Sequence, residues 1–143
     1  SPSASPSVGF ALYSRGDNAS LPTNDNDLET LYSDQEEINV GSRDTRYVGQ
    51  TGVLQYMQHL YKTFAGGHSC GSVQWQGKSS LAPTLSTVYL QIYNRNSASW
   101  ESIDSDAASS ADIDFELEAH IDDLTNYKDS RDLVSCRIYQ LAI

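Results

Sequence analysis

Apolar and polar residues alternate with a period of two through the C-terminal part of the chain, residues 86–143. Between residues 112 and 119, four carboxylates alternate with Ile113, Phe115, Leu117 and Ala119. Successive side chains of a β-strand point to opposite faces, so this period predicts strands with one buried and one solvent-exposed face. Burial on one face only is typical of antiparallel sheets. The pattern therefore predicts an all-β chain that folds as an antiparallel two-sheet sandwich.

Short strand patterns also precede this region, and turn residues separate them. The expected strands cover residues 8–13, 28–32, 37–40, 46–48, 53–64, 72–76, 87–93, 99–103, 112–119 and 133–141. Residues 53–64 also fit one face of a helix, so a short helix is the alternative there. Residues 15–27 are rich in Gly, Asn, Asp, Ser and Pro, which predicts a long loop. Short strands separated by turns favour an immunoglobulin-like or jelly-roll sandwich.

The chain has 143 residues, which suits one domain. Its first seven residues are Ser/Pro-rich, a composition typical of an extended arm. Val8, Phe10 and Leu12 then occupy alternate positions, as in a strand. We therefore divide the chain into an extended N-terminal arm, residues 1–14, and a single β-sandwich domain, residues 15–143.

The charge balance is strongly acidic, with 9 Lys and Arg against 19 Asp and Glu and a formal net charge of -10. Such a surface repels phosphate backbones and anionic membranes, so we expect no nucleic-acid partner. No apolar run approaches the ~20 residues of a membrane helix, so we expect no membrane span. The missing initial Met, the polar composition and the three lysines predict a mature, secreted or cell-surface chain.

Two cysteines, Cys70 and Cys136, lie far apart in the sequence. Cys136 shares the expected inward face of the last strand with Val134 and Ile138. In an oxidising compartment the two would form a disulfide, which is the pairing we predict. Two buried free thiols in a cytosolic protein are the alternative.

The strand pattern at residues 89–94, at Trp100-Glu101, at Phe115 and at residues 136–140 resembles a class of small β-sandwich modules. These modules are appended to secreted and surface proteins of bacteria and their phages. The resemblance covers about the C-terminal half of the chain. It implies an extracellular accessory or structural module, and it assigns no site residues.

Motifs that carry chemistry are absent from the sequence. It contains no Gly-x-Ser-x-Gly, no Cys-x-x-Cys and no His pair with the spacing of a zinc helix. We therefore expect no catalytic activity and no cofactor. Oxygen ligands do occur in expected loops, and the candidate calcium ligands are Asp25, Asp27, Glu29, Asp104 and Asp106. A solvated acidic surface is the alternative for these residues.

Two tryptophans differ in their expected place. Trp75 shares a face with Val73, which predicts a core position, whereas Trp100 follows a turn and could lie at a rim. Aromatic rings of this kind stack on sugars, so Trp100 is the candidate residue of a ligand face. The expected core contains Leu90, Ile92, Phe115, Leu117 and Ile138.

The N-terminal arm leads to the functional prediction. An added strand pairs through its backbone and places alternate side chains in pockets, as Val8, Phe10 and Leu12 would do in a neighbouring copy. Donation from each subunit to the next builds a homopolymer. We thus predict a structural subunit of an extracellular filament or surface assembly. The alternatives are that residues 8–13 form the first strand of their own sandwich, and that the chain is a carbohydrate-binding or adhesive module.

Overall fold

The computed structural model describes residues 11–33, 35, 49–50 and 54–142, with the backbone alone for residues 11 and 12. These residues form β1 (Ala11–Asn18), β2 (Thr30–Leu31), β3 (Tyr56–Phe64), β4 (Gly71–Gly77), β5 (Val88–Asn94), β6 (Ser99–Asp106), β7 (Phe115–Ile121) and β8 (Leu133–Leu141). No helix in this part of the chain is long and apolar enough to cross a membrane.

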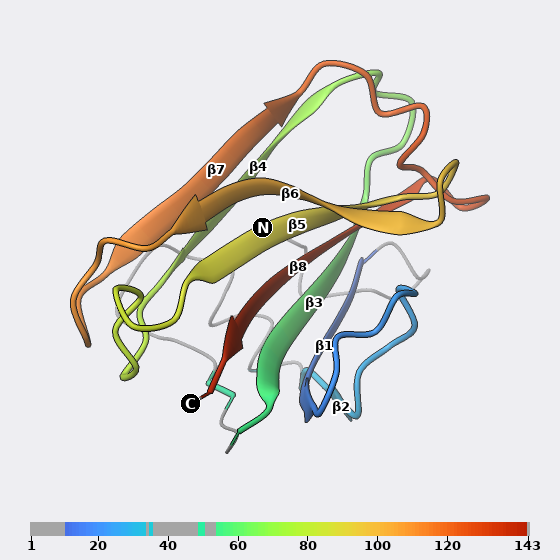
Figure 1. Cartoon of the computed structure of the whole chain (residues 1–143). Coiled ribbons are helices and arrows are strands. Elements are labelled where there is room, and N and C mark those ends of the chain that lie inside the picture. The colour runs from blue at the N-terminus through green and yellow to red at the C-terminus, as the bar shows by residue number, and fades with distance from the viewer. Residues whose placement is uncertain (1–10, 34, 36–48, 51–53, 143) are drawn as a thin grey trace.

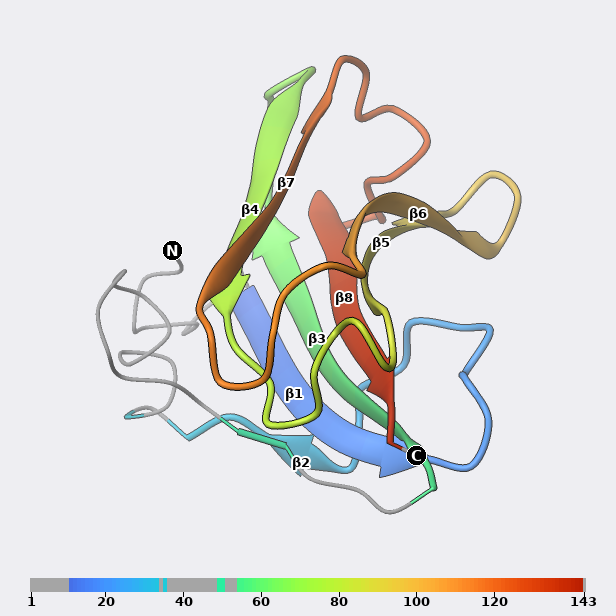
Figure 2. The ribbon, with the colours of Figure 1, turned by 60° about the vertical axis from the view of Figure 1, so that its left-hand side comes forward.

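The strands make two antiparallel sheets that pack face to face (Figures 1 and 2). The large sheet has six strands in the order β2-β1-β3-β8-β5-β6, and the small sheet is the pair β4-β7. β8, the last strand in the sequence, lies in the middle of the large sheet, between β3 and β5. The chain is therefore all-β with two antiparallel sheets, as its alternation predicts.

Most expected strands are confirmed. The ambiguous segment is a strand, Tyr56–Phe64, and the strands expected at 72–76, 87–93 and 133–141 appear as β4, β5 and β8. The expected strand at 28–32 shortens to the two residues of β2. The strands expected at 37–40 and 46–48 lie outside the described residues.

The main core lies between the two sheets. β5 contributes Val88, Leu90 and Ile92, and β8 contributes Val134, Cys136 and Ile138. The other buried members of the core are Phe115, Leu117 and Leu124, with Val73 and Trp75 packed against them. The five residues expected to share one core do so, and Trp75 is on the core side as predicted.

One predicted inward position is wrong. β7 begins at Phe115, and Ile113 is 57% exposed. Asp112 has a φ of 60°, in the left-handed region, so the extended backbone cannot continue through it. The alternation in the sequence therefore begins three residues before β7 does.

The loop expected from residue 15 starts later than predicted. β1 continues to Asn18, and it pairs with β3 from Ala11 opposite Thr63 to Asn18 opposite Tyr56. Residues 11–14, which we assigned to the arm, therefore pair with β3 of their own chain. For these residues the alternative holds, namely a first strand in the chain's own sandwich. Leu12 lies opposite Lys62, whereas Val8 and Phe10 lie outside the described residues.

The predicted disulfide is not formed. Cys136 is buried in the core, as expected, but Cys70 is exposed immediately before β4, and both thiols are free. The alternation shows which face of a strand a cysteine takes. It says nothing of whether a distant loop brings a second thiol within reach. Burial raises the pKa of the Cys136 thiol to about 12, so this thiol stays protonated at neutral pH.

Phe115→Ala tests the position of the core. Phe115 is 8% exposed and its ring centroid lies 5.4 Å from that of Trp75. Deleting a buried ring should lower the free energy of unfolding by about 3–5 kcal/mol in denaturant titrations. Ile113→Ala is the control, and its exposed side chain should change this free energy by less than about 0.5 kcal/mol. Equal losses for the two variants would contradict the assigned faces.

Candidate functional site

The candidate site lies on the face of the large sheet that points away from β4 and β7. We call it the outer face. Because side chains alternate, the neighbours of the core residues point outward here. The outer-face residues are Tyr56, Gln58 and Leu60 of β3, Tyr89, Gln91 and Tyr93 of β5, Trp100 and Ser102 of β6, and Ser135, Arg137 and Tyr139 of β8. This face is polar and aromatic, in contrast to the apolar core.

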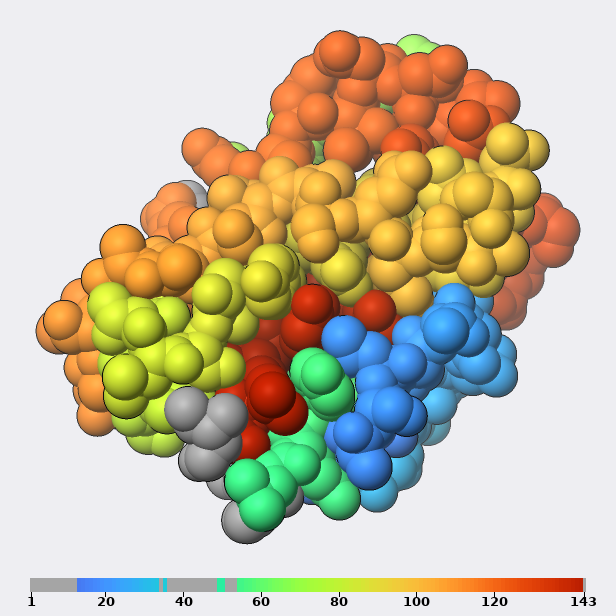
Figure 3. All heavy atoms as spheres, viewed as in Figure 1, coloured from blue at the N-terminus to red at the C-terminus, as the bar shows by residue number. Residues whose placement is uncertain are grey.

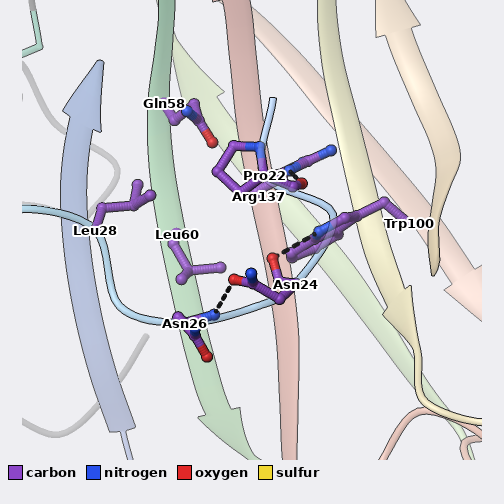
Figure 4. Close-up of a pocket in the computed structure, with 8 residues that line it drawn as sticks. All are labelled: Pro22, Asn24, Asn26, Leu28, Gln58, Leu60, Trp100 and Arg137. Atoms are coloured by element: carbon purple, nitrogen blue, oxygen red, sulfur yellow. Dashed lines mark hydrogen bonds between the residues drawn. The ribbon is translucent and has the colours of Figure 1, made fainter. Parts of the chain in front are cut away.

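The loop between β1 and β2, residues 19–29, crosses part of the outer face (Figures 1 and 4). Its backbone makes polar contacts with the sheet. Trp100 Nε1 donates to Asn24 O at 3.1 Å, and Arg137 Nη1 donates to Pro22 O at 2.7 Å. At the β1 side, Leu28 N donates to Ser14 Oγ at 3.0 Å. The outer face is thus divided into a half under the loop and an open half.

Ion pairs fasten the same loop. Asp25 Oδ2 accepts from Arg95 Nη2 and from Ser135 Oγ, both at 2.7 Å, and Asp27 lies 2.9 Å from Lys62 Nζ. Burial raises the pKa of Asp25, but the hydrogen bonds from Arg95 and Ser135 outweigh that effect. The pKa is therefore lowered from its ordinary value of 3.8. Ion pairs and hydrogen bonds therefore hold the loop against the sheet.

Arg137 is the central residue of the outer face, and it is 5% exposed. Its Nε donates to Gln91 Oε1 at 2.8 Å, and Gln91 Nε2 donates in turn to Ser102 Oγ at 3.0 Å. The guanidinium carbon lies 4.3 Å from the ring centroid of Trp100 and 5.5 Å from that of Tyr139. These contacts fix the plane and the direction of the guanidinium group.

Three tyrosines lie beside Arg137 on the open half. The rings of Tyr89 and Tyr139 stack with centroids 5.0 Å apart, and Tyr56 meets Tyr139 edge-on at 5.9 Å. Burial and the neighbouring Tyr89 hydroxyl raise the pKa of Tyr139, so its hydroxyl is neutral at physiological pH. In Figure 3, atoms of β8 are seen at the bottom of a hollow between the atoms of β5 and those of β3 and β1.

Trp100, the sequence's candidate residue for a ligand face, lies on the outer face. One side of its ring is covered by the Arg137 guanidinium, and the ring of Tyr93 lies 5.2 Å away. Its indole N–H donates a hydrogen bond to the backbone oxygen of Asn24 in the loop. Trp100 therefore supports Arg137, and the open rings of the site are those of the tyrosines.

The five candidate calcium ligands do not come together. Asp104 accepts from Glu118 N, and Asp106 accepts from Ala108 N and Ser109 N, so both fasten local backbone. Asp25 and Asp27 are engaged with basic side chains in the loop, and Glu29 is exposed. Within the described residues, no group of three or more His, Cys, Asp or Glu side chains is arranged to hold a metal ion.

Sequence reasoning missed Arg137, Gln91 and the tyrosine cluster. The alternation in the last strand identifies its inward residues and assigns no role to the outward ones. The available signal was an arginine at the middle of an otherwise alternating strand, flanked on the same face by Ser135 and Tyr139.

No family model, curated protein or solved structure matches this chain. The resemblance to secreted β-sandwich modules therefore stays a prediction.

Asp25→Asn tests how the loop is attached. A carboxyl group whose pKa is lower in the folded than in the unfolded state stabilises the fold above its ordinary pKa, and the effect is lost as the pH falls through the folded-state value. The variant should therefore lose roughly 1–2 kcal/mol of unfolding free energy at pH 7. This difference should shrink as the pH falls below 3.8.

Asp122→Asn is the matched control, since the Asp122 side chain is 96% exposed. Its unfolding free energy should stay within about 0.5 kcal/mol of the wild type at pH 7. Parallel pH profiles for the two variants would show that Asp25 does not fasten the loop.

Proposed function

We propose that the chain is a carbohydrate-binding module of a secreted or cell-surface protein, with the open half of the outer face as its site. The observation that carries this proposal is the cluster of Tyr56, Tyr89 and Tyr139 beside a fixed set of hydrogen-bonding groups. Sugars present apolar C–H faces and polar rims. A tyrosine ring can pack against the C–H face, and its hydroxyl can form a hydrogen bond with the polar rim.

Tyr89 offers the ring face that is best placed for a sugar. One side of its ring is stacked on Tyr139, and on the other side its partner on β6 is the small, exposed Ser105. A short side chain there leaves room for a saccharide over the sheet. The exposed Ser102 lies at the next position along the same face, and its hydroxyl is within reach of sugar hydroxyls.

Tyr89→Ala tests this proposal. Screening on a glycan array followed by calorimetric titration should identify a bound saccharide for the wild type. The variant should lose at least about tenfold in affinity, because stacking of a buried aromatic face is worth on the order of 1 kcal/mol or more. Phe64→Ala is the matched aromatic control. Phe64 lies eight residues along β3 from Tyr56, at the opposite end of the strand, and its loss should leave affinity unchanged.

Circular dichroism and denaturant titration should show that both variants remain folded. A wild type that binds no saccharide on a broad array would contradict the proposal. Equal affinity of wild type and Tyr89→Ala would place the site elsewhere.

A second candidate function is self-association into a homopolymer, and one observation favours it. β4 has no charged residue, and among the described residues it pairs only with β7. Exposed edge strands normally carry charges or other features that prevent pairing with another chain. An uncharged edge accepts an added strand, and the segment around Val8 and Phe10 is the donor that the sequence suggests.

Ser72→Lys/Gln74→Lys tests self-association at this edge. Both residues are exposed on β4, and two lysines should prevent strand addition. The wild type should form polymers in sedimentation velocity and negative-stain microscopy, and the variant should stay monomeric. Ser110→Lys/Ser130→Lys adds the same charge at exposed loop positions and should still polymerise. A wild type that is monomeric at all concentrations would rule out this candidate.

A further inference from the structure

Arg137 carries a buried positive charge that no acidic side chain in the described part of the chain balances. Its two hydrogen bonds go to Gln91 Oε1 and Pro22 O, and both acceptors are neutral. The carboxylate of Asp25, which fastens the nearby loop, is engaged by Arg95 and Ser135. The described ion pairs do not include Arg137.

Such an arrangement costs free energy, because a charge taken out of water is stable only when it is paired or well solvated. The ring of Trp100 offsets part of this cost through a cation–π contact. Burial lowers the pKa of Arg137 to about 10, so the group still carries its charge at neutral pH. An anion bound to the guanidinium group would offset the remainder of this free-energy cost.

The guanidinium group also has free donors in a fixed direction. Of its five N–H bonds, one on Nε and one on Nη1 are used. Nη2 donates to no group among the described residues. Arg137 as a whole is 5% exposed. Nη1 and Nη2 together can donate two parallel bonds to one carboxylate, the arrangement that arginine favours.

The position of Arg137 relative to the tyrosines fits a ligand that touches both. Arg137 and Tyr139 are two residues apart on the same face of β8, a separation of about 7 Å. Their partners on β5 are Gln91 and Tyr89. If a hexose ring packs against the tyrosines, an equatorial substituent of that ring can therefore extend to the guanidinium group of Arg137.

We infer that the saccharide bound at the outer face is acidic, and that a uronate carboxylate pairs with Arg137 while its ring contacts Tyr89 and Tyr139. This inference rests on the proposed carbohydrate-binding function and adds the class of ligand. The net charge of -10 opposes a polyanion at long range. Recognition therefore depends on the short-range pairing of single carboxylates, and added salt should weaken it little.

The decisive experiment varies the ligand, so that it does not depend on a variant that folds poorly. Wild-type protein is titrated with uronate oligosaccharides of several linkages, with their methyl esters, and with neutral oligosaccharides of the same length. The methyl esters keep the shape and remove the charge. Esterification should reduce affinity at least about tenfold, the value of one charge-assisted pair of hydrogen bonds.

Gln91→Glu is the second arm. It places a carboxylate of similar volume next to Arg137 Nε and balances the charge from within the protein. This variant should lose the preference for uronates over their esters and keep its affinity for the esters. Arg137→Met should give the same loss of preference.

The outcomes separate the two claims. Equal affinity for uronates and esters overturns the inference and leaves the carbohydrate-binding proposal standing, whereas no binding to any oligosaccharide overturns both. Tighter binding of sulfated oligosaccharides than of uronates would overturn the assignment of a carboxylate.

Discussion

The pairing of β8 with β3 and β5 is the constraint on which the rest of the structure depends. β8 lies in the middle of the large sheet, and its residues 133–138 are all buried. The residues that point inward, Val134, Cys136 and Ile138, fill the core against β7. The residues between them must then point outward, and Arg137 is one of them. A shift of one residue in this register would exchange the two faces, which is why the register is strongly specified.

The two faces of the large sheet are covered by different means. β4 and β7 cover one face with apolar side chains, and burial of this kind supplies most of the stability of a small domain. The loop at residues 19–29 covers part of the other face through hydrogen bonds and ion pairs, which contribute only about 1 kcal/mol each on balance. The loop therefore positions the groups around Arg137 more than it stabilises the fold. The open half of that face, with its tyrosines, is the part free to meet a ligand.

The alternation of apolar and polar residues was sufficient to predict several strands and their buried faces. A period of two is enough to assign β4, β5 and β8, and it places Leu90, Ile92 and Leu117 in the core. It failed where the backbone itself interrupts the pattern, as at Asp112, whose left-handed conformation leaves Ile113 in solvent. It also failed for the pairing of Cys70 with Cys136, since alternation fixes the face of a residue and not the distance between two segments.

The sequence by itself determined most of the described strands, most of their buried faces and the acidic charge, because these depend on each residue and its neighbours along the chain. Only the tertiary structure decided the outer face. Arg137 binds Pro22, which lies 115 residues away, and stacks on Trp100 from an edge strand. These groups meet because the strand order of the large sheet brings the first and last strands to either side of β3. That order is set by which apolar faces pack together across the whole chain, a property that no local pattern contains.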